Sequence, residues 1–99
     1  METDPEMLNK AVKAYENALL EQTRERVPLD WANTQGGLGN AYGILGEIGK
    51  DREMLNKAVK ALQNAQQVYI YESDQNPSVQ WFKSEISDIQ KKIDAALVN

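Results

Sequence analysis

The sequence predicts an all-α protein, a fragment of an α-hairpin solenoid with four antiparallel helices in one domain over residues 1–99. The first observation behind this class is a duplication: EMLNKAVKA at 6–14 recurs letter for letter at 53–61, within wider copies 4–18 and 51–65 at a period of 47. The second is that apolar residues recur at steps of three and four, the spacing of one helix face. The third is the lack of a competing strand pattern. A duplicated helical unit indicates a repeat architecture.

The first and third predicted helices are the two copies of the duplicated segment. Asp4 is an N-cap residue followed by Pro5 at the first helical position, and Asp51 repeats the cap. We expect the first helix over about 5–25 and the third over about 51–72. Both are amphipathic. Their apolar stripes are Leu8, Ala11, Tyr15 and Ala18 in the first copy and Leu55, Ala58, Leu62, Ala65 and Tyr69 in the second.

The second and fourth predicted helices each follow a break that contains proline. After Val27-Pro28-Leu29, Asp30 is expected to cap a helix over about 30–47, and Asn76 with Pro77 is expected to open another over about 77–97. The apolar stripes are Trp31, Leu38, Tyr42 and Leu45 in the second helix and Val79, Phe82, Ile86, Ile89, Ile93 and Leu97 in the fourth.

All six glycines lie within 36–49, in or just after the second predicted helix. A glycine inside a helix costs about 1 kcal/mol relative to alanine. Glycine also permits a neighbouring backbone to approach closely, which can offset that cost. We therefore expect the second helix to pack tightly between two others as the central element.

Composition excludes most catalytic and metal chemistry. The chain has no Cys and no His, which removes thiol nucleophiles, imidazole bases and the usual zinc ligands. The glycines of 37–43 do not fit a phosphate-binding motif, because their spacing is wrong and no strand precedes them. No catalytic, cofactor-binding or metal-binding residue is predicted, and we expect a protein that is not an enzyme and needs no cofactor.

The net charge of −4 argues against nucleic-acid and anionic-membrane partners, which require a basic face. The N-terminal ten residues lack the apolar stretch of a signal peptide, and no uncharged run is long enough to span a bilayer. We expect a cytoplasmic protein whose partners are proteins or peptides.

Leu38-Gly39-x-x-Tyr42, followed by Ala58-x3-Leu62-x2-Ala65, resembles the signature of the tetratricopeptide repeat (TPR) family. Ala11, Tyr15 and Ala18 repeat the spacing of the second half of that signature. The longer string from Pro28 through Tyr42 resembles the extended bacterial repeats found in arrays beside CHAT-type protease domains. The resemblance covers about residues 6–72 and extends weakly to the last helix, where Gln80-Trp81 echoes Asp30-Trp31. It implies a helical repeat that binds proteins.

The resemblance also implies a binding groove along the second helix. Asn40 matches the peptide-contacting asparagine of the family, whereas Gly36 stands where chaperone-binding members carry a clamp lysine. Trp31 and Trp81, near the starts of their helices, are candidate partner anchors, because tryptophan is enriched at binding hot spots. The groove candidates are Asn33, Gly36, Asn40, Gly43 and Ile44.

In terms of the family, the chain begins with the second helix of a repeat, so the apolar face of that helix needs a cover. The fourth helix, another copy of this protein or a different chain could supply it, and we favour another copy, which makes the protein a self-associating scaffold or adaptor. The candidate self-association residues are Leu8, Val12, Tyr15 and Leu19. Two alternatives are a regulatory module that binds a small ligand between helices, near the glycines, and a designed or truncated repeat array without a native partner.

Overall fold

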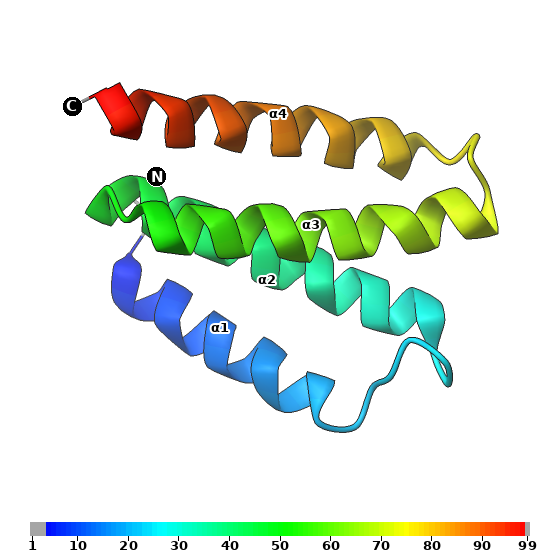
Figure 1. The fold of residues 1–99 in the computed structure, drawn as a ribbon. Coiled ribbons are helices and arrows are strands. Elements are labelled where there is room, and N and C mark those ends of the chain that lie inside the picture. The colour runs from blue at the N-terminus through cyan, green and yellow to red at the C-terminus, as the bar shows by residue number, and fades with distance from the viewer. Residues whose placement is uncertain (1–3, 99) are drawn as a thin grey trace.

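Four helices follow one another along the chain as antiparallel neighbours (Figure 1): α1 (Pro5–Leu19), α2 (Pro28–Gly49), α3 (Arg52–Glu72) and α4 (Pro77–Val98). The computed structural model describes residues 4–98, with side chains for 4–95, so the predicted core position Leu97 lies outside the described side chains. The described residues contain no strand, and they extend over 41 × 27 × 25 Å. The predicted all-α class and the four helices are confirmed.

The predicted caps at three helix starts are confirmed. The carboxylate of Asp4 accepts a hydrogen bond from the Glu6 amide at 2.9 Å, and that of Asp51 accepts from Met54 at 3.2 Å. The side chain of Asn76 accepts from the amide of Ser78 at 2.9 Å. Each cap satisfies a backbone N–H that has no partner inside its helix.

The first helix ends at Leu19, so the prediction that it continues to about residue 25 is wrong. The Leu20 amide bonds to the carbonyl of Asn17, three residues back, which tightens the last turn. The Thr23 hydroxyl then accepts from the Arg26 amide at 3.2 Å. Threonine here gives the backbone a local partner that competes with the helix, and the chain turns toward α2.

The predicted cap of the second helix is also wrong. The helix begins at Pro28, and its N-cap is Val27, whose side chain makes no capping bond. Proline fits the first helical position because its missing N–H would have no partner there. Asp30 instead lies in the first turn, where its negative charge interacts favourably with the helix dipole.

As predicted, α2 is the central helix, and it contacts all three others. Its glycines let side chains of the neighbouring helices lie directly on its backbone. A methyl group at Gly39 would lie 2.7 Å from Cγ of Leu62 in α3, and one at Gly36 would lie 3.1 Å from the Phe82 ring in α4. The contiguous core is formed mainly by α3 and α4 against α2, and its largest fully buried side chain is Leu62.

Candidate protein-interaction site

The two identical segments have different surroundings. In α3 the segment is packed between α2 and α4, whereas α1 contacts α2 alone among the described helices. Leu55 and Ala61 of α3 are 2% and 4% exposed, respectively. Their duplicates in α1 are half-buried Leu8 and exposed Ala14, and no residue of α1 is fully buried. Because the sequence is the same, this difference comes from the missing second neighbour of α1.

The four predicted self-association residues, Leu8, Val12, Tyr15 and Leu19, are half-buried and lie on one stripe of α1. Tyr15 belongs to the contact with α2: a methyl group at Gly37 would lie 2.5 Å from its ring. Tyr15 thus packs within its own chain while keeping part of its surface, and its contact with a second copy stays a prediction. The exposed apolar side chains of α1 include Met7, at 60% exposure, which the sequence reasoning missed.

The predicted groove residues on α2 fall into two groups. Asn33, Asn40 and Ile44 lie on one stripe of the helix, where the two asparagines are exposed and the isoleucine is half-buried. The carboxamide oxygen of Asn33 accepts a hydrogen bond from the Tyr69 hydroxyl of α3. The first group therefore keeps part of its surface available to a partner.

Gly36 and Gly43 form the second group and are buried. Phe82 of α4 lies against Gly36, and Ile89 lies against Gly43, with 3.1–3.2 Å between the nearest atoms and a methyl group placed at either glycine. The prediction that these two glycines line an open groove is wrong, because α4 occupies that space. The same packing fills the space beside these two glycines that the alternative, a small ligand bound between helices, would need.

The two tryptophans differ in exposure. Trp31 is half-buried, and the guanidinium of Arg24 lies 5.9 Å from its ring centroid. Trp81 is 47% exposed and stands edge-on to Phe82, with ring centroids 5.1 Å apart. Trp81 thus retains free surface for a partner, while one side of Trp31 is covered by its own chain.

Tyr42 links α1 and α3 across α2. Its hydroxyl donates to the carboxylate of Glu16 at 3.0 Å, and the ammonium of Lys57 lies 5.9 Å from its ring centroid. Burial raises the pKa of the Tyr42 phenol above its ordinary value, and the hydrogen bond to Glu16 and the negative charge of that carboxylate raise it further. These contacts connect α1 and α3 to α2.

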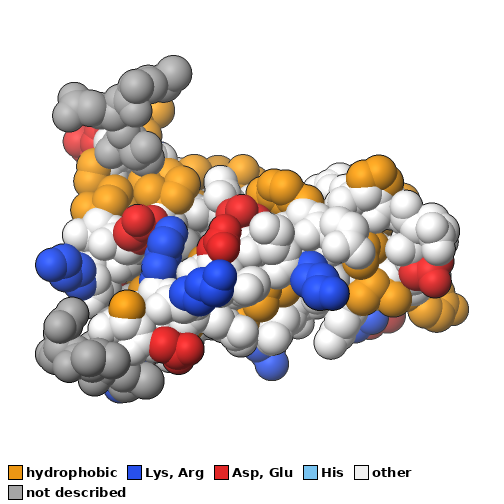
Figure 2. Space-filling view, turned by 90° about the horizontal axis from the view of Figure 1, so that it is seen from above, with side chains coloured by type: hydrophobic (Ala, Val, Ile, Leu, Met, Phe, Trp, Pro, Cys, Tyr) orange, Lys and Arg blue, Asp and Glu red, His pale blue; other side chains and the backbone are white. Residues whose placement is uncertain are grey.

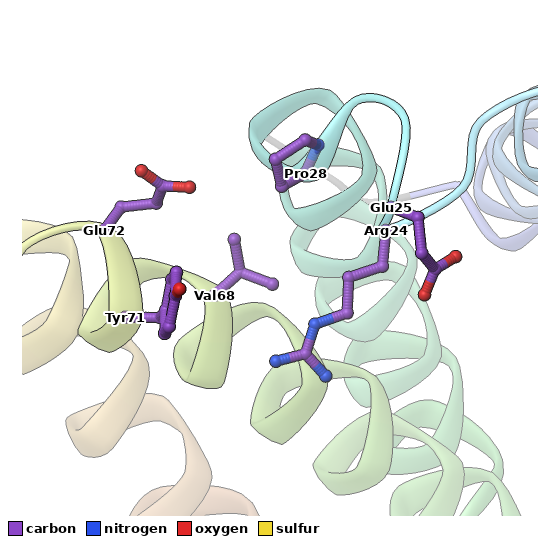
Figure 3. A pocket seen from close by; sticks show the side chains of 6 residues that line it. All are labelled: Arg24, Glu25, Pro28, Val68, Tyr71 and Glu72. Carbon is purple, nitrogen blue, oxygen red and sulfur yellow. The ribbon is translucent and has the colours of Figure 1, made fainter.

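An open cleft of about 280 Å³ lies between the loop after α1 and the C-terminal end of α3 (Figure 3). Its lining residues come from two segments that are at least 40 positions apart in the sequence. No local pattern in the sequence indicates such a site, and sequence reasoning missed it. The lining residues are Arg24, Glu25, Pro28, Val68, Tyr71 and Glu72.

On the face that Figure 2 shows, charged side chains of both signs are spread over the surface, and apolar side chains show between them along its length. Among the described residues, no group of three or more Asp or Glu side chains is placed to hold a metal ion. No helix in the described range is both long and apolar enough to cross a membrane. Comparisons of the chain with protein-family models, with curated proteins and with solved structures found no match.

Proposed function

We propose that the protein is a non-enzymatic protein-interaction module of the TPR type, a scaffold or adaptor that self-associates through α1. One observation carries the proposal: the segment that is buried between two helices in α3 is left half-covered in α1. The sequence of α1 is therefore suited to a second neighbour. Burial of this apolar surface by a partner contributes about 25 cal/mol per Å² of favourable free energy.

The arrangement of the helices supports the TPR-type interpretation. Phe82 lies against Gly36 and Ile89 lies against Gly43, so the contacts follow the same order along α4 and α2, and these two helices run parallel. Alternate helices that run parallel, each joined by an antiparallel neighbour, are the pattern of stacked α-hairpins. The interhelical ion pair between Glu47 and Lys92, at 2.7 Å, continues the same register.

A second copy is the partner we favour for α1. The Met7 side chain is exposed, as is Ala14, while Leu8, Val12 and Leu19 keep part of their surface. These side chains extend along α1, so a helix of a second copy can contact several of them at once. In this arrangement Asn33, Asn40, Ile44 and Trp81 remain on a separate surface for a protein or peptide partner.

The experiment is a solution-mass measurement by light scattering on wild type and two variants. Met7→Glu places a charge on the exposed side of α1, in its first turn, where an acidic residue is compatible with the helix. Gln90→Glu adds the same charge at an exposed position of α4 and is the matched control. We expect wild type and Gln90→Glu to form the same dimer and Met7→Glu to stay near the monomer mass of 11.2 kDa. Equal masses for the two variants would contradict the assignment to α1.

A further inference from the structure

The end of the molecule where α1 and α3 end and α2 and α4 begin has an unusual surface (Figure 1). We call residues 20–31 and 70–81 the loop end. Seven large apolar side chains are exposed in the described part of the chain, and five of them lie in the loop end: Leu20, Leu29, Ile70, Tyr71 and Trp81. Clustered exposed apolar side chains mark interaction surfaces more often than scattered ones do.

The loop end is also acidic. It carries five acidic and two basic side chains, a net charge of −3, whereas the whole chain has −4. Most of the net negative charge is therefore concentrated at one end of the molecule. Such a field attracts positively charged partners and repels acidic ones.

The cleft of about 280 Å³ lies within this surface and has an apolar floor. Val68, which is 3% exposed, and Pro28 face each other across it, and the ring of Tyr71 stands beside them at 86% exposure (Figure 3). The carboxylate of Glu72 lies at one side, and the guanidinium of Arg24 lies at the opposite side. A second hollow of about 200 Å³ shares Pro28 and Glu72 with the first.

The Glu72 side of the cleft favours a cation for two reasons. Glu72 is the last residue of α3, where the helix dipole is negative, and the last turn of α3 has no basic residue. Among the described side chains, no lysine or arginine forms an ion pair with Glu25, Asp30 or Glu72. A cation bound here would lie close to both the carboxylate and the carbonyl end of the helix.

We propose that the cleft binds an arginine or lysine side chain from a basic segment of a partner protein. The aliphatic part of that side chain would lie on Val68 and Pro28 and would also contact the ring of Tyr71. Its cationic group would bind the carboxylate of Glu72. The inference rests on the proposed interaction function. It uses a surface separate from α1, so either can fail without the other.

The test is a titration of the intact protein with a capped pentapeptide that has one arginine between alanines, followed by amide chemical shifts in NMR. The same peptide with glutamine in place of arginine is the peptide control. We expect saturable shifts at residues 24–30 and 68–73, with a Kd on the order of 1 mM. The glutamine peptide should produce no saturable shift.

Three variants separate a specific site from general charge attraction. Glu72→Gln should weaken binding about two- to fivefold, the range for one exposed ion pair. Asp88→Asn, at an exposed position of α4 outside the loop end, removes the same charge and should leave the Kd unchanged apart from a small electrostatic effect. Arg24→Gln should strengthen binding, because it removes a like charge from the cleft.

Equal weakening by Glu72→Gln and Asp88→Asn would overturn the proposal, as would saturable binding of the glutamine peptide or the absence of saturable shifts with the arginine peptide. Light scattering on the same variants keeps the two proposals apart. An unchanged dimer in Glu72→Gln, together with no peptide binding in wild type, would refute the cleft proposal and leave self-association through α1 standing.

Discussion

Truncation of the same leucine in the two identical segments should cost very different amounts of stability. Leu55 is 2% exposed between α2 and α4, so Leu55→Ala removes buried methyl groups and leaves a cavity. A loss of about 3 kcal/mol is expected, within the usual range for a buried leucine. Leu8 has the same sequence neighbours but is half-buried against one helix, and solvent can fill the space it leaves. Its truncation should cost about 1 to 1.5 kcal/mol.

The comparison removes a usual uncertainty, because helix propensity is the same over 6–14 and 53–61, which have the same sequence. Both variants would be unfolded in urea and by heat and followed by far-ultraviolet circular dichroism at about 1 µM, a concentration chosen to favour the monomer. In a domain of this size each kcal/mol lowers Tm by about 4–8 °C, so the two variants should be well separated. Equal losses would refute the reasoning that α1 has one neighbour where α3 has two.

Three further results are expected. Gly39→Ala should destabilise the protein despite the better helix propensity of alanine, because its methyl group would lie 2.7 Å from a leucine side chain of α3. The methyl group of Gly49→Ala would meet nothing within 4 Å, so this variant should be neutral or stabilising. Thermal unfolding compares the stability of the two variants. Lys50→Gly should stabilise the protein by up to about 1 kcal/mol, measured by urea unfolding. Lys50 follows the end of α2 with a φ of 51°, a left-handed conformation that favours glycine. A lower stability of the variant would contradict this reasoning. Glu16→Gln should lower the pKa of Tyr42, because it removes a negative charge and a hydrogen bond to a carboxylate while the burial of the phenol remains. Ultraviolet titration of the phenol in the variant and in wild type measures the change in pKa. An unchanged pKa would show that burial alone raises it.

Three of the four helix starts were predictable because their causes are local. Asp4, Asp51 and Asn76 each lie within three residues of the amide that they cap, so the sequence contains both partners of the bond. The end of α1 was not predictable in the same way. No glycine or proline stands between Leu19 and Pro28 to mark an end, but α1 stops at Leu19 because the chain turns to reach α2 and Thr23 offers a competing backbone bond.

The central position of α2 was predictable from its glycines. The cost of several glycines in one helix is offset when neighbouring helices pack closely against it. Which neighbour covers which glycine was not predictable. Gly36 and Gly43 belong to a stripe that resembles an open groove, and only the placement of α4 shows that Phe82 and Ile89 fill it. The cleft at the loop end escaped prediction because it joins the loop after α1 to the end of α3, which have no pattern in common.

Hydrogen exchange within the duplicated segments tests the central claim most directly. Residues 6–14 and 53–61 have the same sequence, so their intrinsic amide exchange rates are closely matched and any difference reports structure. Exchange would be followed by mass spectrometry at about 1 µM and about 100 µM, a range that brackets micromolar self-association. The account predicts that 6–14 exchanges faster than 53–61 in the dilute sample and becomes protected in the concentrated one, as a second copy covers α1. Exchange of 6–14 that is the same at both concentrations would contradict self-association through α1.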